Sequence, residues 1–193
     1  MKVYIIYTHP NPKSFNHAIL ESFTEGLTEA GHSFEISDLY ADNFKAGLDS
    51  KDLEQIFSGN IPDDIKCYQD KITAAEALVF IYPIWWIDCP ALLKGWIDRV
   101  FLAGFAYRMD EPHIMIPLLK QRKALIINTA GGPWEEYRDK GWKDMIYKLM
   151  GDFILRTCGI QQVEHVIFHN VMITDDNTRK GYLEQAYSLG KDF

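Results

Sequence analysis

The stretch "ALVFIYPIWWIDCPALLKGWIDRV", residues 77–100, combines two patterns that decide the fold. Residues 77–83 form an almost continuous apolar run, which is typical of a strand covered on both faces. Pro90 then suits the first position of a helix, and one apolar stripe follows it, made of Leu93, Trp96, Ile97 and Val100. A buried strand therefore passes into an amphipathic helix, with two adjacent tryptophans between them.

The same alternation runs along the rest of the chain. Four further segments have the pattern of buried strands, at residues 2–8, 33–40, 123–129 and 163–169. Helical patterns lie between them, and alternation of strand and helix indicates a parallel sheet with helices on both faces. Five strands in a chain of this length favour an α/β fold with the flavodoxin-like strand order 2-1-3-4-5.

The helical segments carry their own start and stop signals. Ser14 or Asn16 can cap a first helix that Gly31 ends. The long connection after the second strand has room for two helices, "SKDLEQIF" (50–57) and "IKCYQDKITAA" (65–75). Later helices are predicted over residues 142–158, with a stripe of Ile146, Leu149 and Phe153, and over residues 178–190.

Composition narrows the function classes. The 193 residues, 47% hydrophobic and 24% charged, predict a single globular domain spanning 1–193. The net charge of −7 argues against nucleic-acid binding, which needs a basic surface. Three cysteines without a CxxC pair favour a reduced, cytoplasmic setting over a disulfide or zinc scaffold. The longest apolar run is too short for a membrane span.

In open parallel sheets, ligands bind beyond the carboxyl ends of the strands, where the strand order switches. That rule selects the loops 8–16, 83–89 and 129–137. The first leads into a helix N-terminus, whose free N–H groups favour phosphate, although Ser14 or Asn16 could simply cap the helix. The third begins with two glycines, which either let backbone N–H groups approach a ligand or form a plain turn.

The second loop places Trp85 and Trp86 either in the core or along a cleft, and adjacent residues point to different sides. Trp134 adds another aromatic wall, and Tyr137 can donate a proton or a hydrogen bond. Together the three loops suit a flat conjugated ring with a phosphate tail, and a flavin fits better than a nucleoside triphosphate. Metal binding is not expected, because the spacing of His165 and His169 on a strand does not suit a metal pair.

The segments "PIWWIDCPALLKGWIDRVF…GFAYR", "THPNPKSFN" and "TAGGPWEEY" resemble the flavodoxin-like NAD(P)H:quinone oxidoreductases of the DT-diaphorase type. The resemblance extends over residues 2–169. It implies a homodimer with active sites at the subunit interface, NAD(P)H as co-substrate, a quinone as acceptor and FAD, or alternatively FMN, as the cofactor. Hydride transfer through the flavin and ping-pong kinetics are the mechanism that it implies.

The resemblance also implies roles for individual residues. Tyr137 and Tyr107 are the expected catalytic residues. The substrate side is expected to be lined by Trp86, Phe105, Tyr107 and Trp134. The flavin is expected to be bound by His9, Ser14, Phe15, Asn16, Ala18, Pro83, Ile84, Trp85, Trp86, Ile87, Thr129, Ala130, Gly131, Gly132 and Tyr137.

The chain departs from the family at two points. Lys143 stands where eukaryotic members carry a histidine, so Tyr137 acts alone or with Lys143, and Ala130 replaces a second threonine. Three other functions remain open from sequence. They are nitro- or azo-reduction at the same site, a one-electron carrier of the flavodoxin type, and a flavin-binding regulatory subunit of a potassium-efflux system.

Overall fold

The computed structural model describes residues 1–111 and 114–193. Its centre is a five-stranded parallel sheet with the order β2-β1-β3-β6-β7, which confirms the predicted order 2-1-3-4-5. The strands are β1 (Lys2–Tyr7), β2 (Ser33–Asp38), β3 (Ala77–Pro83), β6 (Lys123–Thr129) and β7 (Gln162–Phe168).

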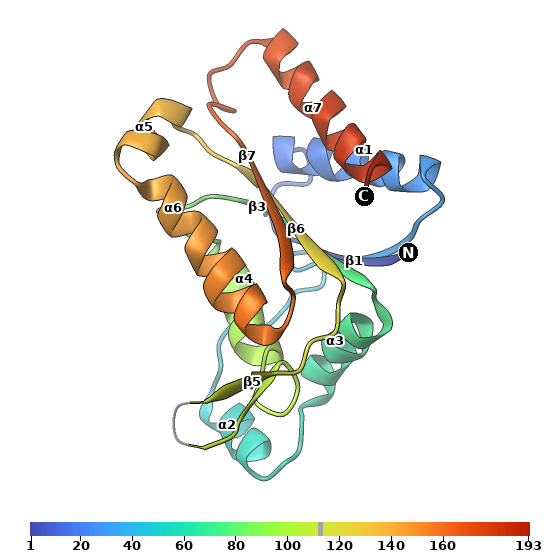
Figure 1. The fold of residues 1–193 in the computed structure, drawn as a ribbon, viewed down its shortest axis with the longest axis vertical. Coiled ribbons are helices and arrows are strands. Elements are labelled where there is room, and N and C mark those ends of the chain that lie inside the picture. The colour runs from blue at the N-terminus through green and yellow to red at the C-terminus, as the bar shows by residue number, and fades with distance from the viewer. Residues whose placement is uncertain (112–113) are drawn as a thin grey trace.

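Helices cover both faces of this sheet (Figure 1). One face packs against α1 (Phe15–Glu29) and α7 (Asp176–Lys191). The other packs against α3 (Asp63–Ala74), α4 (Ala91–Val100) and η1 (Tyr147–Arg156), a helix with π winding. The remaining helices are α2 (Ser50–Phe57), α5 (Trp134–Asp139) and α6 (Trp142–Ile146).

The depth of burial differs between the central and the outer strands. All seven residues of β3 are buried, because helices lie on both of its faces. The sequence predicted five buried strands, and this is wrong for β2 and β7, which lie at the sheet edges and are partly exposed. An edge strand has a neighbouring strand on one side only, so more of it reaches solvent.

The segment after α6 departs most from the predicted helix over 142–158. The stripe predicted at α-helical spacing is wrong, since Leu149 and Phe153 are 37% and 70% exposed. In the π winding of η1 each N–H bonds to the fifth residue back, so a turn contains more residues. The buried positions are accordingly spaced by four or five, at Ile146, Met150, Gly151 and Leu155.

A small antiparallel hairpin, which the sequence did not predict, joins β4 (Tyr107–Met109) to β5 (Met115–Pro117). It lies at the amino end of β6 and is seen at the bottom of Figure 1, far from α5.

Pro90 precedes α4 as its N-cap and is not the first helical residue, a shift of one position from the prediction.

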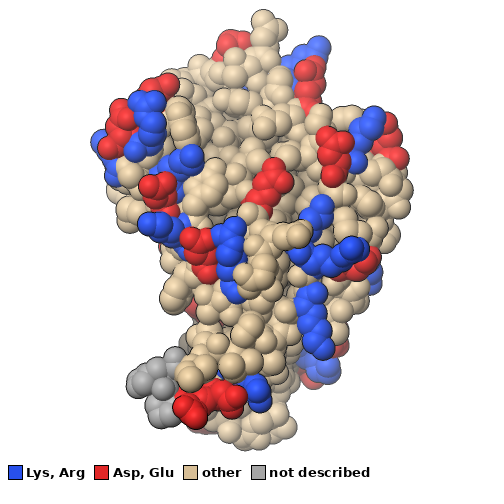
Figure 2. Space-filling model, in the orientation of Figure 1, with Lys and Arg blue, Asp and Glu red and all other residues tan. Residues whose placement is uncertain are grey.

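The charged surface shows no dominance of one sign on the face drawn in Figure 2, where basic and acidic side chains are interspersed.

One arginine is buried in the interior. Arg99 is 1% exposed and binds both carboxylate oxygens of Asp52, the carboxylate of Asp64 and the carbonyl of Lys45. These contacts join α2, α3 and α4 and give the buried guanidinium four hydrogen bonds, three of them to carboxylates.

Helices α1 and α7 cross in direct backbone contact. A Cβ atom added to Gly26 would overlap the carbonyl oxygen of Tyr187, and one added to Gly190 would overlap that of Phe23. The crossing therefore requires glycine on both helices, because no side chain fits between the two backbones. This contact fixes the layer that buries one face of β1 and β3.

Substituting Gly26→Ala should lower the free energy of unfolding by about 1–3 kcal/mol, because α7 must move away from α1. The change is measured by urea denaturation. The matched control is Gly181→Ala in α7, the partner helix, where the added Cβ meets nothing within 4 Å. That substitution should raise stability by up to about 1 kcal/mol through helix propensity. An equal gain for Gly26→Ala would contradict the close crossing.

Candidate functional site

Three loops meet at the carboxyl edge of the sheet, beyond β1, β3 and β6. Two hydrogen bonds hold them together through one residue. The side-chain amide of Asn16 donates to the Thr129 hydroxyl at 2.7 Å, and the Ile84 N–H donates to the Thr129 carbonyl at 2.8 Å. Thr129 is 3% exposed, so its polar groups tie the loops to one another. The predicted meeting of loops 8–16, 83–89 and 129–137 is therefore seen in the structure.

The first loop ends at the N-terminus of α1. Ser14 is the N-cap, and its hydroxyl accepts the N–H of His17 and lies 3.3 Å from the Tyr7 hydroxyl. In the part of the chain that the structure describes, the N–H groups of Phe15 and Asn16 donate to no other group. Ala18 was expected to bind the cofactor, but its N–H already donates to the Ser14 carbonyl. The free donors of this loop are thus those of Phe15 and Asn16.

The second loop turns sharply between Trp85 and Asp88, which exchange two backbone hydrogen bonds of 2.9 and 3.1 Å. Its central residues, Trp86 and Ile87, have φ of 53° and 64°. This is the left-handed region, where a bulky or β-branched residue is strained by about 1–2 kcal/mol. Trp86 is fully exposed, and Trp85 is 42% exposed with its ring 6.3 Å from that of His9.

The third loop carries the two glycines. Among the described residues, the N–H groups of Gly131 and Gly132 have no partner. A Cβ atom on Gly131 would meet only Met172, at 3.9 Å, whereas one on Gly132 would lie 3.2 Å from the Tyr137 ring. Gly131 therefore presents an open backbone, and the Tyr137 ring covers Gly132.

The loop after β7 supports these glycines from behind. Asn170 donates its N–H to the Gly132 carbonyl at 3.2 Å, and Val171 donates to the Ala130 carbonyl at 3.2 Å. His169 lies edge-on to the rings of Tyr137 and Trp134, with centroids 5.0 and 5.4 Å apart. Sequence reasoning missed His169 as a site residue, although the rule that selected three strand ends applies equally to the end of β7.

Two buried polar atoms at the base of the loops have no hydrogen-bond partner among residues 1–111 and 114–193. They are the Thr8 hydroxyl and the side-chain carbonyl of Asn16. Both residues are almost completely buried. Unpaired buried polar atoms are costly, and a protein keeps them where a ligand or water completes the hydrogen bonds.

Burial sets the protonation of the titratable groups around the edge. It lowers the pKa of His9, although the backbone of Asn11 partly opposes the shift. It raises the pKa of Tyr137, and the nearby Glu136 adds to this effect. Burial also raises the pKa of Cys89 to about 12, so that this thiol remains protonated and is a poor nucleophile. The edge therefore holds neutral hydrogen-bonding groups at neutral pH.

The structure does not bring every expected site residue to this edge. Phe105 and Tyr107 lie in and next to the β4–β5 hairpin, at the opposite end of the sheet. The ammonium of Lys143 lies over the rings of Trp134 and Tyr147, at 4.6 and 5.3 Å from their centroids. The described residues include no hydrogen bond between Lys143 and Tyr137.

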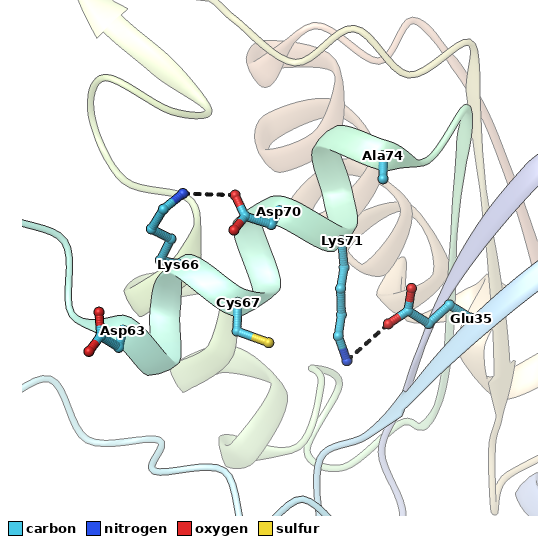
Figure 3. A pocket seen from close by; sticks show the side chains of 7 residues that line it. All are labelled: Glu35, Asp63, Lys66, Cys67, Asp70, Lys71 and Ala74. Atoms are coloured by element: carbon cyan, nitrogen blue, oxygen red, sulfur yellow. Dashed lines mark hydrogen bonds and ion pairs between the residues drawn. The ribbon is translucent and has the colours of Figure 1, made fainter.

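A surface depression with a volume of about 530 Å³ lies elsewhere, between α3 and β2 (Figure 3). Its lysines are already paired, Lys66 with Asp70 at 2.9 Å and Lys71 with Glu35 at 3.3 Å. Neither lysine is therefore free to bind an anion in this depression. Within the described ranges, no group of three or more acidic, histidine or cysteine residues could hold a metal ion. In the same ranges, every helix is too short or too polar to cross a bilayer.

Comparison with known proteins agrees with this fold. A family model described as flavodoxin-like fold matches residues 1–189. A Haemophilus influenzae protein named an uncharacterized NAD(P)H oxidoreductase is 33% identical over 94% of this chain and 90% of its own length. NAD(P)H dehydrogenase (quinone) 1 of Rattus norvegicus is 31% identical over 93% of this chain and 73% of its own.

A solved structure, the NAD(P)H:quinone oxidoreductase from Methanothermobacter marburgensis, is also similar. It superimposes with a TM-score of 0.93 at 37% sequence identity, covering 100% of this chain and 98% of its own. The match covers the sheet, the helices on both faces and the loops at the carboxyl edge. The chain therefore belongs to the flavodoxin-like NAD(P)H:quinone oxidoreductase family and is an oxidoreductase, as its resemblance predicted.

Proposed function

We propose that this protein is a flavin-dependent NAD(P)H:quinone oxidoreductase that binds FAD, or alternatively FMN, at the loop edge. One observation carries the proposal. Two pairs of unpaired backbone N–H groups, at Phe15–Asn16 and at Gly131–Gly132, lie on either side of a strained turn that exposes Trp86. A ligand with a phosphate at one end, a flat ring and a polar ring edge fits these three features.

The chain's own groups would bind such a ligand in three places. The α1 N-terminus, with the Ser14 cap, suits a phosphate because its free N–H groups and helix dipole favour negative charge. Trp86 offers a flat apolar surface beside the ring. Gly131 and Gly132 offer two N–H donors to the polar edge, and charge that develops there is stabilised by fixed donors. When bound, the flavin supplies the hydride-accepting chemistry.

The roles expected for Phe105 and Tyr107 require a second copy of the chain. In one chain these residues lie at the opposite end of the sheet from Trp86, so they cannot line the same site. A homodimer in which the hairpin of one subunit covers the loop edge of the other would bring them together. Apolar side chains support an interface, since Met145, Leu149 and Phe153 are 61%, 37% and 70% exposed on consecutive helical turns.

The proposed function is tested by absorbance and steady-state kinetics. The purified protein should show the absorbance bands of a flavin, and mass analysis of the released cofactor separates FAD from FMN. NADH or NADPH oxidation with a quinone should give parallel double-reciprocal lines, because one site is used in turn by both substrates. Intersecting lines would reject the ping-pong mechanism, and the absence of flavin after reconstitution would reject the function. Assays with a nitro and an azo compound measure the alternative acceptors at the same site.

Substituting Trp86→Gly should raise the stability of the protein and lower its affinity for the cofactor. Glycine relieves the left-handed strain, which should raise the free energy of unfolding by about 1 kcal/mol. Loss of the ring surface should weaken flavin binding about tenfold, a change of ~1.4 kcal/mol measured by fluorescence titration. The control is Asn43→Gly, an exposed left-handed residue outside the loop edge, with φ of 50°. It should leave flavin affinity unchanged, and unchanged affinity in Trp86→Gly would remove Trp86 from the site.

Substituting Phe153→Glu should dissociate the proposed dimer. A charge in an apolar interface should raise the dimer dissociation constant by at least about a hundredfold, equivalent to ~2.7 kcal/mol. Analytical ultracentrifugation measures the constant, and quinone turnover should fall with the dimer because Tyr107 leaves the neighbouring site. Lys148→Glu, an exposed position of the same helix, is the control. A Phe153→Glu variant that sediments as the natural protein does would place the interface elsewhere.

A further inference from the structure

His169 is the most unusual polar side chain at the loop edge. It is 9% exposed, and in the described part of the chain neither of its ring nitrogens makes a hydrogen bond. An imidazole always carries at least one N–H donor, and a neutral ring also has one acceptor. Two unpaired nitrogens on one buried ring are therefore a substantial cost, which indicates that the ring is kept for a reason other than packing.

The position of this ring relates it to the two glycines. It packs edge-on against Tyr137, whose ring in turn lies against Gly132. The Gly132 carbonyl lies near enough to favour a proton on the imidazole, although no hydrogen bond of ordinary geometry joins them. The His169 backbone is itself fixed, since its carbonyl accepts the Tyr182 hydroxyl at 3.1 Å. His169 is thus held at the back of the Gly131–Gly132 edge.

Lys143 is less well placed for this role. Its ammonium lies over the rings of Trp134 and Tyr147, and among the described residues it makes no hydrogen bond to Tyr137. The charged groups that act on His169 are Glu135, which favours the protonated imidazole, and Lys143, which disfavours it. Burial is the largest effect and keeps the ring neutral in the free protein by lowering its pKa.

We propose that His169 is a positioning residue whose ring holds Tyr137 over Gly132 and whose unpaired nitrogens stabilise negative charge at the Gly131–Gly132 edge. The inference rests on the proposed function, because that edge faces the flavin ring only if a flavin binds here. Two-electron reduction by a hydride adds one negative charge to a flavin. A neutral imidazole behind the edge can balance that negative charge by taking up one proton from solvent.

The principal test distinguishes the contribution of the aromatic ring of His169 from that of its two nitrogens. His169→Phe keeps an aromatic ring between Trp134 and Tyr137 but removes both nitrogens, and His169→Gln keeps a donor and an acceptor without the ring. Oxidised flavin should bind to His169→Phe within about twofold of the natural protein. Reduced flavin should bind about tenfold more weakly, which corresponds to a two-electron potential lower by ~30 mV. His169→Gln should recover part of that difference.

The matched control is His165→Phe, which removes the histidine that lies within β7. His165 is hydrogen-bonded to the side-chain oxygen of Asn128, so its loss should lower the melting temperature. His165 lies beside the ring of Tyr147 and outside the loop edge, so its loss should leave the flavin potential unchanged. A potential that falls equally in His165→Phe and His169→Phe would show a general effect of destabilisation and would overturn the inference.

A second measurement keeps the inference testable if His169→Phe does not fold. The histidine proton resonances of the natural protein are titrated in the oxidised and the reduced state, with His169→Gln used for assignment. The His169 pKa should rise on reduction, and an unchanged value would overturn the proposal. Failure of the natural protein to bind flavin would reject the proposed function itself. Normal binding and reduction with an unchanged potential in His169→Phe would reject only the role of His169.

Discussion

Complete burial of β3 is the constraint on which the rest of the structure depends. A strand covered on both faces cannot leave polar backbone unpaired, so β1 and β6 must pair with it and helices must lie above and below. The chain then leaves the sheet on one edge from all three strands, and the order switches between β1 and β3. The loops that meet there are the ones that cannot be covered by a crossover helix, and this is why the candidate site is found at that edge.

Much of this could be predicted from the sequence, and the exceptions have physical reasons. The apolar runs of β1, β3 and β6 located the sheet, and the strand-end rule located the site. The winding of η1 could not be predicted, because Leu149 and Phe153 fit an α-helical stripe and only packing selects the wider turn around Met150 and Leu155. The turn at Trp86 and Ile87 was also missed, since sequence rules expect glycine or asparagine where φ is positive. His169 belongs to no motif, and only the fold brings it to Tyr137.

Local rules are broken mainly around the site. Elsewhere caps, glycines and ion pairs agree with the fold, as at the buried Arg99 or the Ser14 cap. At the loop edge the chain accepts a strained and fully exposed Trp86, and side-chain atoms of Thr8, Asn16 and His169 that have no partner among the described residues. Concentration of such conflicts in one place is expected where selection for function outweighs local stability.

The contact between α1 and α7 has a consequence for how the protein is made. Helix α1 is translated well before α7, yet its apolar residues Phe23 and Leu27 are buried in a layer that α7 completes. A nascent chain must therefore carry an uncovered apolar helix until α7 has been translated. The glycine face at Gly26 cannot accept a substitute, since only another backbone fits it. During translation, α1 therefore exposes an apolar face that can aggregate until α7 is available to cover it.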